Sequence, residues 1–282
     1  MNSSPLTLVL GATGKTGSRV AARLEAHNVP VRRAARSGTE VVFDWADATT
    51  RGAALEGVER IYLIGPLLRT DFAAQVGDFL DLAQAAGTRH VTYLSMHDIE
   101  AAPAETAQRR VELDLASRVG LTHTILRPAW FMQNFSESFL APVNGTIVVP
   151  TGNGAEAFVD VEDIAAVATV TLLEPTAHHR AQYAITGPEA LTVAQAAAIL
   201  GEATGETIRH QDIDRAAWAS GLTANGVPAD YAKVVRALTE TIATGRGAQP
   251  TDIVARLTGS APTSFADFAR RLATSRPSTE VA

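Results

Sequence analysis

The stretch Leu6-Thr-Leu-Val-Leu-Gly11-Ala-Thr-Gly14-Lys-Thr-Gly17-Ser-Arg-Val20 decides the fold of this chain. Its first five residues are apolar or β-branched, which is typical of a buried parallel strand. Three glycines follow at the spacing GxxGxxG, and an apolar helical pattern then continues to about His27. A strand, a glycine-rich turn and a helix in this order predict a dinucleotide-binding loop, and a purely structural glycine turn is the alternative.

The three glycines of this loop have distinct expected roles. Gly11 permits the tight turn, Gly14 lets a pyrophosphate approach the backbone, and Gly17 lets the helix pack closely on the strand. Free amide N–H groups at the helix start, together with the helix dipole, would hold the phosphates. The loop residues expected to bind the cofactor are Gly11, Thr13, Gly14, Lys15, Thr16 and Gly17.

Composition excludes several classes of function. The 282 residues carry a net charge of -6, so there is no excess of cations for nonspecific binding to nucleic acid. There is no cysteine, which excludes disulfides, thiolate catalysis and cysteine-ligated metals. No apolar run has the length of a membrane span and no secretory leader is recognisable, so we expect a cytoplasmic protein that does not bind membranes.

Strands and helices alternate regularly up to residue 128. Apolar runs predict strands over residues 6–10, 29–34, 41–45, 60–64, 90–95 and 121–127, and helical spacing predicts helices ending near residue 27 and over 49–55, 72–86 and 104–119. This alternation predicts an α/β fold, a Rossmann-type doubly wound parallel sheet. In such sheets ligands bind beyond the carboxyl ends of the strands.

The pattern changes after residue 128. Short strands are expected at 146–149, 182–185 and 208–212, an amphipathic helix over 161–173, and a helix capped by Thr192 over 192–202, with about three more helical segments following. We therefore predict a dinucleotide-binding domain over residues 1–150, with its core reaching about residue 190. Residues 151–282 are expected to supply a small C-terminal α+β substrate cap that does not fold alone.

The end of the second predicted strand indicates which dinucleotide binds. NAD-preferring folds place an Asp or Glu there, whereas this chain has Arg32, Arg33 and Arg36 around the position. Guanidinium groups suit a 2′-phosphate, which favours NADPH, with Arg36 as the best single candidate. The alternative is that these arginines only solvate a strand end. Asp44, after the third strand, is expected to meet the adenine edge.

Several sequence blocks resemble the NmrA-like, atypical short-chain dehydrogenase family. They are Gly11-Ala-Thr-Gly14-Lys-Thr-Gly17, Phe43-Asp44-Trp45, Ile61-Tyr-Leu-Ile-Gly-Pro66, Leu126-Arg-Pro-Ala-Trp-Phe-Met-Gln-Asn134-Phe and Phe158-Val-Asp-Val-Glu-Asp163-Ile-Ala. Within that family they are most similar to the reductases of ergot-alkaloid assembly that form agroclavine and festuclavine. The resemblance implies NADPH-dependent reduction of a cyclic iminium, although the family also contains NADP-responsive regulators.

The positions at the strand ends complete the expected cofactor site. Ile64, Gly65 and Pro66 follow the fourth strand, Ser95 ends the fifth, and Pro128 follows the sixth. All of them are expected to line one crevice. Ser95 is expected to hold either the nicotinamide or the substrate.

The proton-donating pair of ordinary short-chain dehydrogenases, Tyr-x-x-x-Lys, is absent. Residues 108–110 are Gln-Arg-Arg, where other NmrA-like proteins carry a Lys or His. Either the protein does no chemistry, or its chemistry needs no protein acid, as in hydride addition to a cationic iminium. If an acid is needed, His97 and Asp98 after the fifth strand are the candidates, with two inert, solvated loop residues as the alternative.

Aromatic residues follow the sixth strand, where the nicotinamide is expected. We expect Trp130 and Phe131 to bind the substrate and Phe135 and Phe139 to pack into the core. Other polar residues are given structural roles: Asp160 and Asp163 as a helix cap and a first-turn charge, and the pair at 178–179 as surface histidines that bind no metal.

The sequence thus predicts an NADPH-dependent oxidoreductase that transfers hydride to the C=N bond of a small cyclic imine or iminium in specialised metabolism. The alternatives are an NADPH-dependent carbonyl or quinone reductase and a non-catalytic NADP(H)-sensing regulator. The expected partner is a small-molecule substrate, and a homodimer is one possible assembly.

Overall fold

The computed structural model describes residues 4–275, which form two compact units. Unit 1 contains the chain up to Pro128 together with Val161–Ile185 and Ile253–Ser260. Unit 2 contains Ala129–Asp160, Thr186–Asp252 and the chain from Ala261 onward. This division differs from the expected boundary at residue 150, because the chain leaves unit 1 after Pro128 and returns to it twice.

Unit 1 is built on a parallel sheet of seven strands in the order β3-β2-β1-β4-β5-β6-β9. Each neighbouring pair is parallel. The order reverses between β1 and β4, which is the point where doubly wound sheets bind their ligands. The predicted Rossmann-type fold is therefore confirmed. The strands are β1 (Thr7–Leu10), β2 (Val31–Ala35), β3 (Val41–Val42), β4 (Arg60–Ile64), β5 (His90–Leu94), β6 (Thr122–Pro128) and β9 (Gln182–Ile185).

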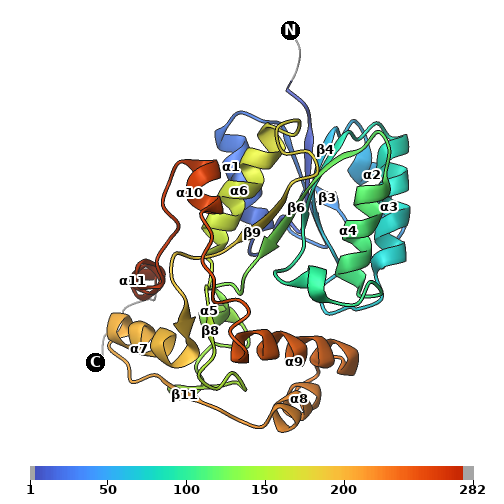
Figure 1. Cartoon of the computed structure of the whole chain (residues 1–282). Coiled ribbons are helices and arrows are strands. Elements are labelled where there is room, and N and C mark those ends of the chain that lie inside the picture. The colour runs from blue at the N-terminus through green and yellow to red at the C-terminus, as the bar shows by residue number, and fades with distance from the viewer. Residues whose placement is uncertain (1–3, 276–282) are drawn as a thin grey trace. The chain divides into compact units, whose positions relative to one another are not determined.

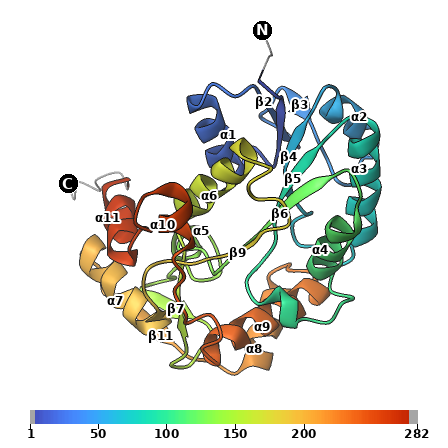
Figure 2. The ribbon, with the colours of Figure 1, turned by 45° about the horizontal axis from the view of Figure 1, so that its top comes forward.

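Helices cover both faces of this sheet (Figures 1 and 2). One face carries α1 (Gly17–Ala26) and α6 (Val161–Leu173), and α10 (Ile253–Thr258) packs against α6 and β9. The other face carries α2 (Thr50–Leu55), α3 (Ala73–Ala85) and α4 (Ala107–Ser117). The central strands β1 and β4 contribute fully buried leucines and an isoleucine to the core beneath α3.

Two local expectations for unit 1 were wrong. The third strand ends at Val42 instead of residue 45, because the backbone turns at Asp44, whose carbonyl accepts from the Asp47 amide at 3.0 Å. The rings of Phe43 and Trp45 pack edge-on against Phe79 of α3. Helix α6 has the predicted bounds but is buried on nearly all sides, so it is not amphipathic. The reason is its packing, since α1, α10 and the strands β4, β5 and β6 all contact it.

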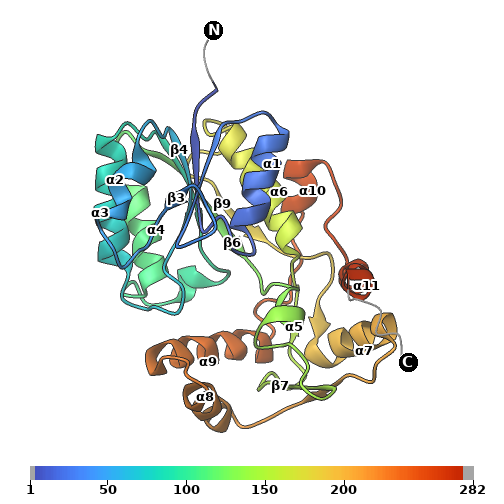
Figure 3. The same ribbon diagram turned by 180° about the vertical axis from the view of Figure 1, so that it is seen from behind.

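Unit 2 combines short strands with helices. β7 (Thr146–Val148) pairs in parallel with β11 (Arg209–Gln211), and β8 (Ala155–Glu156) pairs antiparallel with β10 (Leu191–Thr192). Its helices are α5 (Asn134–Glu137), α7 (Val193–Thr204), α8 (Arg215–Ala224), α9 (Ala229–Ala243) and α11 (Phe265–Ser275). Helix α11 packs on α7 (Figure 2), and α8 lies beside α9 (Figure 3).

The helix cap and the buried aromatic residue predicted for unit 2 are found in the structure, whereas the expected number of helices was too low. Thr192 caps α7 as predicted, in a capping box with Gln195. Four helices follow β11 in the described chain, including α10 of unit 1, where about three were expected. The core of unit 2 contains the fully buried Phe135, whose ring meets those of Phe158 and Phe265 edge-on at 5.0 and 4.9 Å. The core position predicted for Phe135 is confirmed.

Within residues 4–275, no helix combines the length and the apolar character needed to cross a bilayer.

Candidate functional site

The glycine loop between β1 and α1 adopts the conformation that its sequence predicts. Gly11 has a φ of +62°, in the left-handed region. The Gly14 amide donates to the Gly11 carbonyl at 2.8 Å and closes a tight turn. A Cβ on Gly17 would lie 2.3 Å from the Gly11 carbonyl oxygen, so only glycine allows α1 to begin this close to β1. The expected roles of Gly11 and Gly17 in the turn and in close packing are confirmed.

The start of α1 offers donors to an anion. In the described part of the chain, the amide N–H groups of Thr13, Thr16 and Gly17 donate no hydrogen bond. They stand at the positive end of the helix dipole, where a phosphate group supplies the missing acceptor. The donors and the absent side chains at the glycines fit a dinucleotide pyrophosphate.

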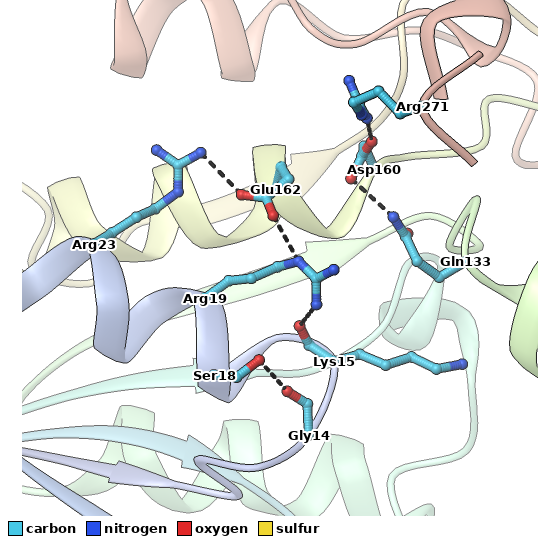
Figure 4. Close-up of polar contacts among 9 residues, drawn as sticks. All are labelled: Gly14, Lys15, Ser18, Arg19, Arg23, Gln133, Asp160, Glu162 and Arg271. Atoms are coloured by element: carbon cyan, nitrogen blue, oxygen red, sulfur yellow. Dashed lines mark hydrogen bonds and ion pairs between the residues drawn. The ribbon is translucent and has the colours of Figure 1, made fainter. Parts of the chain in front are cut away.

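A second layer of contacts holds this loop in unit 1 (Figure 4). Arg19 donates from Nη1 to the Lys15 carbonyl at 2.7 Å and from Nε to Glu162 of α6 at 2.7 Å. Arg23, one turn further along α1, also pairs with Glu162 at 3.2 Å. The Ser18 hydroxyl donates to the Gly14 carbonyl at 2.7 Å. These contacts tie the loop and α1 to α6.

The three arginines at the end of β2 have different environments. Arg32 donates to the backbone carbonyls of Ala54 and Glu56. Arg33 forms a two-point ion pair with Glu25, with N–O distances of 2.8 and 2.7 Å. Arg36 is exposed and has no hydrogen bond or ion pair within residues 4–275. Of the three, Arg36 is therefore the one available to a 2′-phosphate.

The other expected cofactor residues lie at the carboxyl ends of the strands of unit 1. Ile64 ends β4 and Gly65 and Pro66 follow it, all three half-buried, and the Ile64 side chain occupies the space that a Cβ on Gly11 would need. The Asp44 carboxylate accepts from the Ala46 amide at 2.9 Å, so one of its oxygens already serves a turn. Pro128 ends β6, and its carbonyl accepts from the His97 amide at 3.0 Å.

A buried ionic cluster lies below the end of β5, and sequence reasoning missed it. Glu112 of α4 is 1% exposed and receives two hydrogen bonds from Arg127 of β6, at 3.0 and 2.7 Å. Arg109 donates to the same carboxylate at 2.9 Å, and Arg127 also pairs with Glu100 at 3.1 Å. Burial alone would lower the pKa of Arg127, but its bonds to Glu112 hold that pKa above the ordinary value.

Ser95 belongs to this cluster. Its hydroxyl donates to Oε1 of Glu112 at 2.7 Å, and the residue is 8% exposed. Two sequence signals pointed to the cluster: an acidic residue among the apolar positions of the helix, and an arginine inside the apolar sixth strand. The expected contact of Ser95 with nicotinamide or substrate stays a prediction, now with the hydroxyl proton already engaged.

Tyr62 of β4 and Tyr93 of β5 are poorly suited as proton donors. Tyr62 and Tyr93 are buried in the core, and burial raises the pKa of both hydroxyls far above its usual range. The two lysines of the chain are Lys15 in the glycine loop and Lys233, which pairs with Asp230 on the exposed surface of α9. Neither lysine stands four residues after a tyrosine, in agreement with the sequence reading.

His97 and Asp98 follow β5 and are both half-buried. Asp98 has a φ of +61° and begins a short 3-10 helix, η1 (Ile99–Ala101). A left-handed aspartate is uncommon but tolerated, because its short polar side chain can bond locally. Their assignment as an acid pair stays a prediction.

The aromatic residues expected to bind substrate belong to unit 2. Trp130 and Phe131 are half-buried, and Trp130 packs on the edge of the unit 2 core. The Phe131 backbone forms a bridge to Val159. Phe139 is partly buried and contacts the Trp218 ring edge-on at 6.4 Å. Both Trp130 and Phe131 therefore retain exposed surface for a ligand, whereas Phe135 does not.

One further sequence assignment changes in the structure, whereas that of Asp160 as a helix cap stays a prediction. His178 is buried and its Nδ1 lies 2.7 Å from the Tyr183 hydroxyl, so it is not the surface residue that was expected. Asp160 is fully buried, accepts from Gln133 at 3.0 Å and pairs with Arg271 of α11 in unit 2 (Figure 4). Asp163 lies in the first turn of α6, as predicted.

Known proteins resemble the chain along almost its whole length. A family model described as the NmrA-like family matches residues 4–254. The uncharacterized oxidoreductase YesF of Bacillus subtilis (strain 168) is 36% identical over 278 residues, with 95% of each chain covered. Agroclavine dehydrogenase of Claviceps fusiformis is 31% identical over 278 residues, with 93% of this chain and 95% of the relative covered.

A solved structure shares the fold of this chain. The NADPH-dependent quinone oxidoreductase QOR2 of Escherichia coli, in complex with NADPH, matches with a TM-score of 0.76 and 25% identity. The match covers 95% of this chain and 99% of that one.

Proposed function

The chain belongs to the NmrA-like family, and from this premise we propose that it is an NADPH-dependent reductase that transfers hydride to a small cyclic imine or iminium. Its similarity to oxidoreductases over nearly the whole length supports the coarser statement, an NAD(P)H-dependent reductase. NADPH is its cofactor. The C=N substrate is the finer part of the proposal.

The chain's own residues provide for the cofactor. The amides of Thr13, Thr16 and Gly17 would bind the pyrophosphate, and Arg36 would pair with the 2′-phosphate. NADPH supplies the hydride equivalent when bound. The role of the protein is to place donor and acceptor together and to exclude water.

The observation that carries the C=N assignment is that no tyrosine of the sequence has a lysine four residues after it, which leaves His97 and Asp98 as the candidates if an acid is needed. Reduction of a carbonyl leaves an alkoxide that needs a proton, and the buried Tyr62 and Tyr93 are poor donors for it because burial raises their pKa values. When hydride adds to the carbon of an iminium, the C=N π pair moves to nitrogen and a neutral amine results. No acid is required, which matches the residues present. Trp130 and Phe131 would stack on such a flat cation.

Quinone or carbonyl reduction is the second candidate, favoured by the likeness to QOR2. The experiment is NADPH oxidation, followed by loss of the near-ultraviolet absorbance of the reduced nicotinamide, with cyclic imines, ketones and quinones compared at matched concentration. Turnover confined to imines supports the proposal. Turnover confined to quinones or ketones replaces it with the second candidate, and NADPH binding without any turnover leaves a nucleotide-sensing role.

A further inference from the structure

A serine hydroxyl has one proton to donate, and in Ser95 that proton is committed. Both oxygens of the Glu112 carboxylate accept hydrogen bonds from guanidinium groups, those of Arg127 and Arg109. A carboxylate only accepts hydrogen bonds. The 2.7 Å contact between Ser95 and Oε1 of Glu112 therefore has the serine as its donor.

The arrangement is rigid enough to persist. Glu112 is 1% exposed and Arg127 is almost completely buried, so their two-point pair is shielded from water. Arg127 lies on β6, the strand next to the edge strand β9, and Glu112 lies on the helix α4. If the Ser95 hydroxyl turned away from Glu112, Oε1 of this buried carboxylate would keep Arg127 as its single hydrogen-bond donor, which is unfavourable.

What remains of Ser95 for a ligand is its oxygen lone pairs. Ser95 directly follows β5, at the carboxyl edge of the sheet where ligands of this fold bind, and it keeps 8% of its surface exposed. The lone pairs of an incoming carbonyl oxygen would face those of the serine oxygen, and no hydrogen bond could form. An N–H group would find an acceptor.

We infer that Glu112 is a positioning residue that fixes Ser95 as a hydrogen-bond acceptor, so that the site selects substrates carrying an N–H, namely protonated cyclic imines, over carbonyl compounds. This inference rests on the proposed reductase function and narrows its substrate class. It adds a role for a residue pair, Ser95 and Glu112, that lies outside the glycine loop and the aromatic residues.

Glu112→Gln gives the sharpest prediction. Oε2 receives two guanidinium donors, from Arg127 and Arg109, whereas Oε1 receives one, from Arg127 Nε, besides the Ser95 hydroxyl. The glutamine oxygen should therefore take the Oε2 place, and its NH₂ should face Ser95 with loss of the Arg127 Nε hydrogen bond. Ser95 would then accept from the amide and turn its own proton toward the ligand. The preference should invert, from N–H donors toward carbonyl acceptors, which a merely structural residue would not cause.

The experiment is a binding titration of the NADP⁺-loaded protein with a cyclic secondary ammonium ion, its N,N-dimethylated form and the isosteric cyclic ketone. The wild type should prefer the N–H ammonium ion over the other two by about tenfold, the value of one hydrogen bond to a charged donor. Ser95→Ala, which removes the acceptor without disturbing the ion pairs, should abolish that preference. Ser95→Thr should retain it.

Two matched control variants test whether the change in ligand preference is specific to Ser95 and Glu112. Ser117→Ala removes another hydroxyl near α4, one that bonds only to the Asp114 carbonyl, and Glu105→Gln neutralises an exposed acid before α4. Neither should change the preference. If Glu112→Gln does not fold, the Ser95 variants still decide the question.

The outcomes separate this inference from the proposed function. N–H preference that disappears in Ser95→Ala supports the inference, even if no imine is turned over. Equal affinity for all three ligands, or no binding of the ammonium ion, overturns it, even if imines are reduced. Weaker NADP⁺ binding by Ser95→Ala with unchanged ammonium binding also overturns it, because Ser95 would then contact the cofactor.

Discussion

Replacing Arg36 by alanine should weaken NADPH binding and leave NADH binding almost unchanged. Arg36 is exposed and forms no hydrogen bond or ion pair within residues 4–275, so the replacement removes no interaction of the folded protein. A hydrogen bond to a charged group contributes about 1.5–3 kcal/mol, and exposure to solvent favours the lower end. About 1.5 kcal/mol corresponds to a roughly tenfold larger Kd for NADPH.

Isothermal titration calorimetry with both cofactors, at low and at high salt, measures this difference. Arg33→Ala is the matched control, since that guanidinium is already paired with Glu25 and should change neither Kd by more than about twofold. Arg36→Glu should weaken NADPH further by repulsion of the 2′-phosphate. The difference should shrink at high salt. Equal losses for NADPH and NADH in Arg36→Ala would refute the reasoning, because NADH has no 2′-phosphate.

Three further predictions address the loop, the substrate side and pH. Gly17→Ala should abolish NADPH binding in calorimetry and lower the Tm by roughly 4–8 °C, the shift that about 2 kcal/mol produces in a large domain, because its Cβ would lie 2.3 Å from the Gly11 carbonyl oxygen; an unchanged Tm would contradict this packing. Trp130→Ala should lower kcat/KM for an imine by about tenfold while the Kd for NADPH stays within about twofold, and an unaltered rate would place its role in packing alone. Burial lowers the pKa of His90 from 6.5 to about 3, so below pH 6.5 the unfolded chain binds the proton and the native chain does not. The free energy of unfolding should therefore fall between pH 6.5 and 3 in urea titrations, and His90→Gln should flatten that fall; identical pH profiles would contradict the assignment.

The fold of unit 1 could be predicted because its signals are local. Continuous apolar runs mark the buried parallel strands, and the glycine spacing requires the tight turn found at Gly11. Where prediction was wrong, distant packing decided the structure. Phe43 reads as part of a strand, yet its ring packs on Phe79 of α3, and α6 is surrounded by elements that helical periodicity alone does not announce.

The candidate site, like the fold, could be predicted from the sequence only in part. The choice of Arg36 over its neighbours could be guessed from the sequence, but the reason became visible only with the partners of Arg32 and Arg33. The cluster around Glu112 could not be predicted, because α4 and β6 bring its charges together from separate segments. The two sequence signals, an acid among the apolar positions of a helix and an arginine inside an apolar strand, do not show that the two residues meet.

The interleaving of the two units has a consequence for biosynthesis. A ribosome completes β6 and then makes Ala129–Asp160, which belong to unit 2, before it makes α6 and the edge strand β9. Until α6 and β9 emerge, the nascent sheet carries β6 as an unpaired edge, and the apolar strands under α6 lack their cover. Translation that pauses in this interval exposes a surface prone to pairing with other chains. The nucleotide-binding half of the molecule can thus close only after part of the other half has been synthesised.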